Sequence, residues 1–194
     1  MYSLGYISKY DLSLVPTKVN NVHFTYFWDS LKEVVMEFDK TVYSDGYAYE
    51  LYNYKNKKIS SGIASYSGTY LKNITSNAFY KVRVRSYVTV NNKVLYGAWS
   101  DYKIFGQQPK VSIKASGRTL KLSWSKVKGA RNYNVYMSTK QKSGYKKIST
   151  LKKTSLRVTK FKKKSLSKKK TYYVYVVANT KGGKTHVEKC YYLI

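Results

Sequence analysis

An alternating pattern that occurs twice along the chain constrains the fold most. In each half, three alternate positions are apolar and the positions between them are mostly polar: Val34, Met36 and Phe38, and later Leu120, Leu122 and Trp124. Corresponding residues lie 86 positions apart, and Tyr47 and Tyr133 keep the same separation. Apolar residues at a period of two indicate a half-buried strand. The pattern therefore favours two copies of one β domain.

Two later landmarks repeat in the same order. The tetrapeptide KKIS occurs at 57–60 and at 146–149, and the regular segments YKVRVRSY and YYVYVVAN begin at Tyr80 and Tyr172. The separation grows from 86 to 89 and then to 92. Small loop insertions between two copies of one domain produce such a drift, although one larger barrel remains an alternative.

We place the domain boundary near residue 107, because Gly106 and Pro109 punctuate a stretch without apolar alternation. The predicted domains are 17–106 and 107–194, preceded by an N-terminal extension at 1–16. Tyrosine is enriched in strands, and the 23 tyrosines therefore favour an all-β chain. Cys190 is the only cysteine, which excludes an intrachain disulfide.

Each half resembles a fibronectin type III domain, the second more closely. In LKLSWSKVKGARNYNVYMS, Trp124 matches the core tryptophan of the family's second strand, and Phe38 takes its place in the first half. Leu166 and Tyr172 resemble the leucine and tyrosine at the corner before the sixth strand, and Ile74 and Tyr80 repeat their spacing. The segment YGAWSDYK at 96–103 resembles the family's last strand. The resemblance implies an all-β fold of two tandem fibronectin type III-like Greek-key β-sandwiches.

The charge is strongly asymmetric between the two halves. The chain has 37 Lys and Arg against nine Asp and Glu, for a net charge of +28. Residues 1–106 carry a net charge of +5 and residues 107–194 carry +23, with Glu188 as the only acid of the second half. A cationic surface of this kind attracts polyanions.

A lysine-dense segment after Thr159 is the candidate polyanion-binding site: Lys160, Lys162, Lys163, Lys164, Lys168, Lys169 and Lys170. Its ligands would be anionic cell-wall polymers such as teichoic acids, or host glycans. The alternative is a solvated loop in a lysine-rich protein. Nucleic acid is disfavoured, because the sequence has no evident arginine-rich or aromatic-basic reading surface. The tyrosines of GYAYELYNY (46–54) form a second candidate, an exposed surface for sugar rings or a protein partner; the alternative is a compositional bias toward strand-forming residues.

The chemistry of an enzyme is not recognisable in this sequence. His23 and His186 are placed in different copies, which argues against a hydrolytic triad. Glu33 and Glu37 alternate with the core residues of a predicted strand and so face solvent. Asp39, Asp45 and Glu50 do not match the spacing of a calcium loop. We therefore expect no catalytic residues, no cofactor and no metal.

The sequence predicts a non-catalytic spacer or adhesion module of a bacterial cell-surface or secreted protein, with other domains of a larger parent protein as its partners. The alternative is a polyanion- or glycan-binding module that anchors a larger protein, such as a carbohydrate-active enzyme. No apolar run is long enough for a membrane span, and the first residues do not form a signal peptide. An exported protein would then contain this chain as a fragment.

Overall fold

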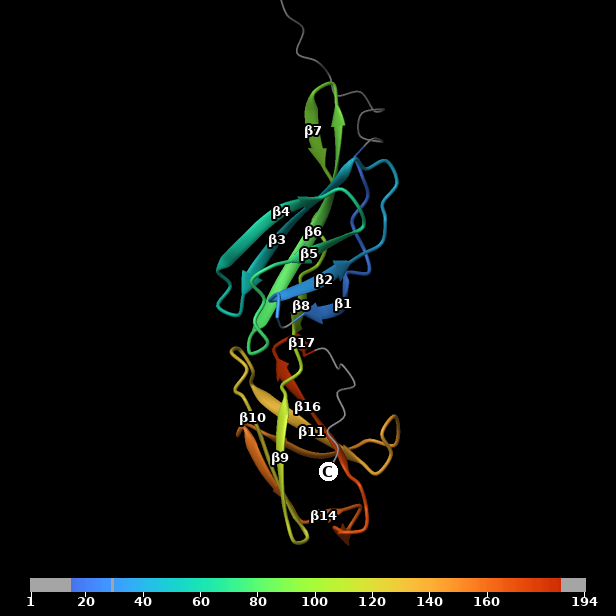
Figure 1. Ribbon diagram of the computed structural model, residues 1–194. Coiled ribbons are helices and arrows are strands. Elements are labelled where there is room, and N and C mark those ends of the chain that lie inside the picture. The colour runs from blue at the N-terminus through green and yellow to red at the C-terminus, as the bar shows by residue number, and fades with distance from the viewer. Residues whose placement is uncertain (1–14, 29, 186–194) are drawn as a thin grey trace, which may run out of the picture. The chain divides into compact units, whose positions relative to one another are not determined.

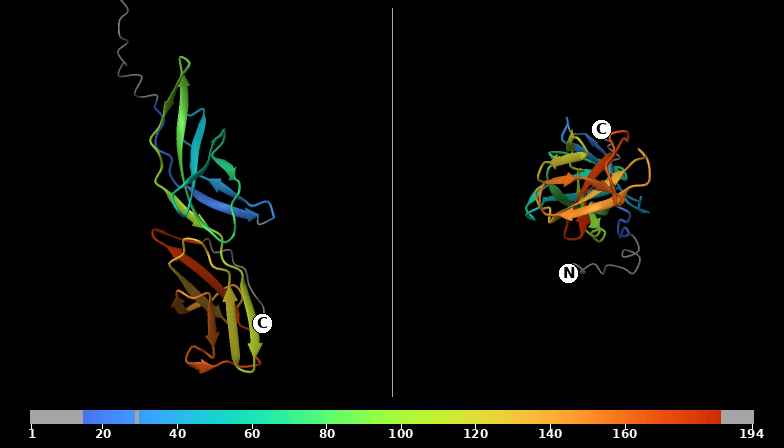
Figure 2. Two further views of the ribbon diagram at one scale, coloured as in Figure 1. Left: turned by 90° about the vertical axis from the view of Figure 1, so that its left-hand side faces the viewer. Right: turned by 90° about the horizontal axis from the view of Figure 1, so that it is seen from below.

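The computed structural model describes residues 15–28 and 30–185 (Figures 1 and 2). Within these residues the secondary structure consists of strands, and no helix of a length and apolarity suited to crossing a membrane occurs. The chain divides into two compact units: residues up to 74 with 81–103, and residues 75–80 with those from 104 onward. The predicted boundary near residue 107 stays a prediction, since two short segments before it group with the second unit.

The first unit consists of two antiparallel sheets (Figure 1). One sheet contains, in this order, β1 (His23–Trp28), β2 (Glu33–Glu37) and β5 (Gly68–Leu71). The other contains β4 (Lys58–Ala64), β3 (Gly46–Asn53), β6 (Phe79–Val90) and β7 (Lys93–Tyr96), and β8 (Lys103–Gly106) also pairs with β6. The chain changes sheet after β2, after β4 and again after β5.

The second unit repeats this arrangement. One sheet contains, in this order, β13 (Ser155–Val158), β10 (Thr119–Trp124) and β9 (Val111–Ser116). The other contains β12 (Lys146–Leu151), β11 (Asn132–Ser138), β16 (Tyr173–Thr180) and β17 (Gly183–Lys184). A short ribbon of β14 (Lys160–Phe161) and β15 (Lys164–Ser165) is added. Leaving the ribbon aside, strands one, two and five form one sheet in each unit, as in fibronectin type III domains. The predicted fold class is therefore confirmed.

The alternating residues of the repeat fill the two cores. Val34 and Met36 on β2, and Leu122 on β10, are almost completely buried. Phe38 and Trp124 are also buried, and each packs its ring edge-on against the tyrosine that opens the next strand. The ring centroids of Phe38 and Tyr47 are 4.7 Å apart, and those of Trp124 and Tyr133 are 5.6 Å apart. The same aromatic pair thus closes both cores.

Four buried tyrosines also fix loops through their hydroxyl groups. Each hydroxyl accepts a hydrogen bond from a backbone N–H five or six residues upstream: Tyr47 from Thr41 (3.0 Å), Tyr80 from Thr75 (3.0 Å), Tyr133 from Val127 (2.9 Å) and Tyr172 from Ser167 (3.0 Å). A buried tyrosine usually finds such a partner, because an unpaired hydroxyl in a core is costly. Each unit therefore carries two equivalent loop anchors.

The ribbon of β14 and β15 accounts for most of the drift in the repeat, which totals six residues between the first and last landmarks. Leu71 and Val158 are equivalent, because they pair with the equivalent residues Val34 and Leu120. The next buried residues in the loops that follow are Ile74 in the first unit and Leu166 beyond the ribbon in the second. Leu166 lies eight positions after Val158, against three positions in the first unit. The insertion is therefore five residues, larger than the three expected from the landmarks.

Candidate functional site

The predicted lysine-dense segment forms the β14–β15 ribbon and the loop that follows it. The side chains of all seven lysines, from Lys160 to Lys170, are exposed. Residues 107–187 contain no Asp or Glu, so this part of the chain supplies no carboxylate to neutralise them. Buried Phe161 and Leu166 hold the segment to the core, and Tyr172 fixes the loop through Ser167. The structure thus presents these lysines on an anchored segment.

The turn of the ribbon has an unusual backbone. Lys162 and Lys163 have φ values of 50° and 65°, in the left-handed region that L residues other than Gly, Asn and Asp seldom adopt. Asn91 and Asn92 form a two-residue turn of the same kind elsewhere, between β6 and β7, with φ values of 49° and 61°. Asparagine and glycine suit such turns, and lysine does not. Two cations therefore occupy turn positions that would be more stable with other residues.

Replacing this turn should raise stability. We expect the double variant Lys162→Asn, Lys163→Gly to unfold with a free energy about 1–2 kcal/mol higher than the parent, because its residues tolerate positive φ. Urea denaturation measures the difference. The reverse change in the first unit, Asn91→Lys with Asn92→Lys, is the control and should lower stability. A loss of stability in the Lys162 and Lys163 variant would contradict the proposed strain.

A small pocket lies beside the loop in the second unit. It has a volume of about 200 Å³ and lies between the β9–β10 hairpin and residues 166–172. Arg118, Lys168 and Lys170 line it, together with the backbone of Gly117 and the buried Leu166. Residues 107–187 supply no carboxylate to these three cations, which makes the pocket attractive to an anionic group.

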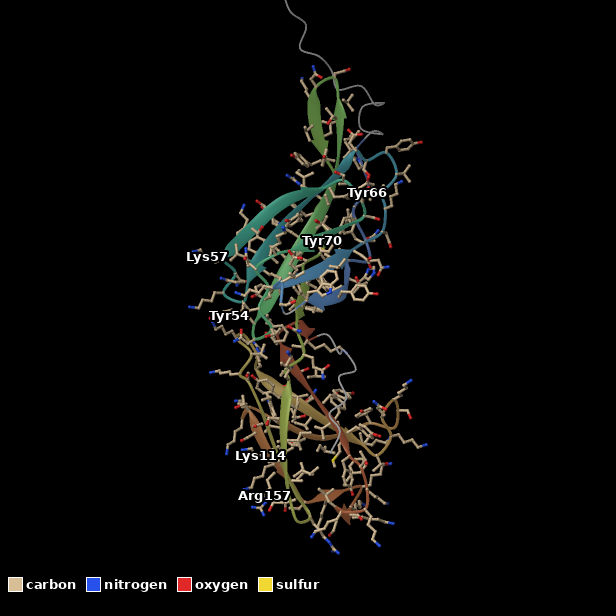
Figure 3. The ribbon with its side chains drawn as sticks, in the orientation of Figure 1. Tyr54, Lys57, Tyr66, Tyr70, Lys114 and Arg157 are labelled. Carbon is tan, nitrogen blue, oxygen red and sulfur yellow. The ribbon has the colours of Figure 1, made fainter. Side chains whose placement is uncertain are left out.

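A second group of cations lies on the outer face of the β13-β10-β9 sheet (Figure 3). Lys121 on β10 pairs in register with Lys114 on β9 and with Arg157 on β13. All three side chains are exposed, and directly opposite side chains of neighbouring strands lie about 5 Å apart. Like charges at this spacing repel each other. We call these three residues the cation row.

The same positions of the first unit are occupied by aromatic and apolar residues. Val35 is equivalent to Lys121, and it pairs with Tyr70 on β5, which is equivalent to Arg157. On the other side of Val35, the bulge of β1 places Thr25 and Tyr26 opposite it. Tyr26 and Tyr70 each stack with Trp28, at centroid distances of 6.0 and 5.8 Å and interplanar angles of 12° and 24°. We call Tyr26, Trp28 and Tyr70 the aromatic row.

The tyrosines of residues 46–54 do not form the exposed surface considered from the sequence. Tyr47 is buried, and Tyr49 and Tyr52 are half-buried, because β3 is a central strand of its sheet. Tyr54 is partly exposed at the end of the strand. Tyr26 and Tyr70 of the aromatic row, on the opposite sheet, are more exposed, at 63% and 54%.

A ladder of alternating cations and aromatic rings covers part of β6, and the sequence interpretation missed it. Lys81, Arg83 and Arg85 alternate along the strand, and their charged groups lie between the rings of Tyr96, Trp99, Tyr102 and Tyr52. The Arg85 guanidinium carbon is 3.7 Å from the centroid of Tyr96 and 4.4 Å from that of Trp99. Cations over aromatic faces attract each other by about 0.5–2 kcal/mol per contact.

The segment between β7 and β8 supplies the rings of Trp99 and Tyr102, whereas Tyr96 ends β7 and Tyr52 lies on β3. The predicted last strand at 96–103 is interrupted: β7 ends at Tyr96, β8 begins at Lys103, and the residues between them have no regular assignment. Gly97 and Ser100 donate backbone hydrogen bonds to β6, at 2.9 and 2.8 Å. The segment that resembles the family's last strand therefore lies along β6, but it is interrupted between β7 and β8. The three-residue spacing of Tyr96, Trp99 and Tyr102 was the available signal for the ladder.

Glu50 fixes the end of the ladder near Tyr52. Its Oε2 accepts hydrogen bonds from Nε of Arg83 at 2.8 Å and from the Tyr52 hydroxyl at 2.7 Å, and it forms an ion pair with Nη2 of Arg83 at 2.6 Å. Burial acts to raise the pKa of Glu50, but the hydrogen bonds from Tyr52, Arg83 and Lys58 outweigh it and hold the pKa at about 2. The bond to Glu50, with burial, raises the pKa of Tyr52 to about 12.

This lowered pKa predicts a loss of stability in acid. A carboxyl group whose pKa is lower in the folded state stabilises the fold above its ordinary pKa of 4.5, and this contribution is lost as the pH falls toward about 2. We expect Glu50→Gln to cost about 1–3 kcal/mol at pH 7 and much less near pH 2. Urea denaturation of both proteins from pH 7 to pH 2 measures it. A cost that does not change with pH would contradict this role of Glu50.

The remaining candidate residues have separate partners. Nδ1 of His23 lies 2.7 Å from the Asn21 carbonyl oxygen, and Nε2 lies 3.4 Å from Glu37. Asp39 accepts a hydrogen bond from Asn21, and Asp45 accepts one from the Thr89 backbone. Among residues 15–28 and 30–185, no three His, Cys, Asp or Glu side chains gather as metal ligands would. His186, Glu188 and Cys190 lie outside the described residues.

Comparisons with known proteins gave matches to solved structures only. No family model matches the chain, and no curated protein matches it. A two-domain fibronectin type III segment from chicken tenascin matches at 11% identity and a TM-score of 0.40, over 91% of this chain and 98% of that one. The FN1-FN3 domains of chicken CNTN1 match at 14% identity and a TM-score of 0.40, over 93% of this chain and 67% of that one. The strand order of each unit, rather than these superpositions, establishes the fold.

Proposed function

We propose that this chain is a non-catalytic spacer or adhesion module of a bacterial cell-surface or secreted protein, joined to other domains of a larger parent. The observation that carries this proposal is the arginine–aromatic ladder. It holds the segment from Tyr96 to Tyr102, near the end of the first unit, against β6 through Lys81, Arg83 and Arg85. A sandwich whose last segment is fastened by side chains as well as backbone resists being pulled apart, which suits a spacer.

Stretching the full chain between two handles tests the proposal. We expect two separate unfolding events, each releasing roughly 300 Å, because about 90 extended residues of roughly 3.5 Å each are freed per unit. Trp99→Ala should lower the force of one event and leave the other unchanged. A single event, or extension without resistance, would contradict a spacer made of two sandwiches.

A second candidate function is polyanion binding by the second unit, which would anchor a larger protein to wall polymers or host glycans. The cation row favours it: three exposed cations lie in register on a unit whose residues 107–187 contain no carboxylate. Their mutual repulsion is relieved when an anionic polymer neutralises them. The lysines of the ribbon and the cations at the pocket add to the same charge.

Binding of polyphosphate to the full chain across a salt series tests this function. The triple variant Lys114→Ser, Lys121→Ser, Arg157→Ser should weaken binding and reduce the slope of log K against log salt by roughly two to three, since each neutralised cation contributes about 0.7–0.9. Removing three exposed lysines of the first unit, Lys55, Lys57 and Lys93, is the matched control for net charge. Equal effects of the two triple variants would show attraction by net charge alone and would exclude a site.

A further inference from the structure

We propose that the aromatic row and the cation row recognise one class of ligand, an anionic polysaccharide in which uncharged sugar units are interspersed with anionic groups. The sugar units stack on Tyr26, Trp28 and Tyr70 of the first unit, and the anionic groups pair with Lys114, Lys121 and Arg157 of the second. The inference rests on the polyanion-binding function proposed above and names its ligand.

The outer faces of the equivalent sheets in the two units carry different kinds of side chain. Both rows lie on the outer face of the sheet formed by strands one, two and five of their unit. The cation row has one residue on each strand, whereas the aromatic row lies on strands one and five, with Val35 on the strand between them. The inward residues stay apolar in both copies, as Val34 and Leu120 show. Core packing therefore explains the residue types that face inward, but it does not explain the aromatic and cationic residues that face outward.

The aromatic row presents ring surface to solvent. Tyr26 is 63% exposed, Trp28 38% and Tyr70 54%, and their planes are within 24° of one another where they stack. Soluble proteins rarely expose gathered aromatic side chains without a binding role. The negative face of an aromatic ring attracts the C–H groups on the flat side of a sugar, while the sugar hydroxyls remain available for hydrogen bonds.

The charges beside the aromatic row select uncharged sugar units. Glu33 pairs in register with Trp28 and forms an ion pair with Lys72 at 3.9 Å, and Glu37 lies further along the same strand. Carboxylate oxygens accept hydrogen bonds from sugar hydroxyls and repel phosphate, sulfate or carboxylate groups. A nucleotide that stacked here would bring its phosphate close to these acids. Because Lys72 balances Glu33, the aromatic row offers no net positive charge to attract the phosphates of a single-stranded nucleic acid.

The cation row supplies the attraction for the anionic groups. Lys114 and Lys121 act as point charges, whereas Arg157 can form two parallel hydrogen bonds to a carboxylate or sulfate. Neighbouring strands lie about 4.8 Å apart, so the three cations extend along roughly 10 Å of a polymer.

Three polymers separate the two interactions in binding measurements on the full chain. Carboxymethyl dextran of low substitution has sugar rings and scattered anionic groups, unmodified dextran has rings alone, and polyphosphate has charge alone. The aromatic variant is Tyr26→Ser, Trp28→Ser, Tyr70→Ser, and the cation variant is that described above. The control for the aromatic variant is Tyr43→Ser with Tyr66→Ser, which removes two exposed rings elsewhere.

We expect the aromatic variant to bind carboxymethyl dextran at least about tenfold more weakly with an unchanged salt slope. A base stacked on an aromatic side chain is worth about 1–3 kcal/mol, and we take a stacked sugar unit to be of the same order. The cation variant should bind it more weakly with a reduced slope. Polyphosphate binding should respond to the cation variant alone, and any weak dextran binding to the aromatic variant alone. Circular dichroism confirms that each variant is folded.

An aromatic variant that binds carboxymethyl dextran as tightly as the parent overturns this inference and leaves polyanion binding intact, provided that the cation variant still weakens polyphosphate. If the parent binds neither charged polymer at physiological salt, the polyanion function fails together with the inference. Tighter binding of an oligothymidylate, lost in both variants, would replace the polysaccharide with single-stranded nucleic acid.

Discussion

Replacing Trp124 with alanine is expected to lower the free energy of unfolding of the second unit by about 3–5 kcal/mol. The side chain is buried between the two sheets and packs edge-on against Tyr133. Because a domain of about 90 residues is only modestly stable, this loss should leave much of the second unit unfolded. The remaining tryptophans, Trp28 and Trp99, then report on the first unit, whose urea midpoint in fluorescence should stay unchanged.

Two further variants control this prediction. Phe38→Ala removes the equivalent residue of the first unit and should destabilise that unit alone. Trp124→Phe places in the second unit the residue type that the first unit already has, and its cost should be smaller, about 1–2 kcal/mol. If Trp124→Ala lowered the stability of both units equally, the two cores would not be separate.

Trp99→Ala is expected to destabilise the first unit by about 3–4 kcal/mol. The indole lies between the guanidinium groups of Arg83 and Arg85, each with its carbon 4.4 Å from the ring centroid. The loss of the indole removes two cation–aromatic contacts, one from Arg83 and one from Arg85. Arg85 keeps its contact with Tyr96, but its Nε is buried without a hydrogen-bond acceptor in the described part of the chain, so the loss of the indole is costly there. Urea denaturation followed by circular dichroism measures the change.

The matched variants separate the ladder from simple loss of a ring. Trp99→Phe keeps an aromatic face between the two arginines and should cost less than half as much as alanine. Trp28→Ala removes a tryptophan that is more exposed and touches no cation of the ladder, and it should change stability by less than about 1 kcal/mol. Equal losses for Trp99→Ala and Trp28→Ala would show that the ladder adds no stability.

Gly97 allows the ladder segment to approach β6. A Cβ atom there would lie 2.5 Å from the Pro16 carbonyl oxygen and 2.7 Å from the Ser86 hydroxyl. Pro16 is buried, so the described chain packs against the first unit from this residue onward, although the predicted extension at 1–16 included it. Residues 1–14 of that extension lie outside the described residues.

The sequence pattern predicted what depends on local periodicity. The alternation around Met36 and Leu122 correctly predicted two strands and the side chains that each buries. The repeated spacing of Tyr80 and Tyr172 correctly marked two tyrosines whose hydroxyls bind the backbone of the preceding loop. These features recur because each copy must bury the same face and satisfy the same backbone groups. The ribbon was not predicted, since its two-residue turn has lysines where a turn signal would be Asn and Gly.

The cation row, the aromatic row and the ladder could not be predicted from the pattern within any single strand, because each depends on which segments lie side by side. Lys114, Lys121 and Arg157 are distant in sequence, and only the register between strands brings them together. The ladder depends on pairing β6 with a segment that is not a strand, so the alternation of Arg83 and Arg85 gave no indication of its partners. The predicted lysine segment was found exposed, but its role in binding stays a prediction.

Amide hydrogen exchange of the full chain tests most directly the claim that each copy holds its own core. We predict two sets of slowly exchanging amides, one in β2, β3 and the middle of β6, the other in β10 and β11, because these central strands are paired on both sides. In Trp124→Ala, exchange should accelerate in the second set alone. Equal acceleration in both sets, or no protected amides between residues 111 and 184, would contradict two separate sandwiches.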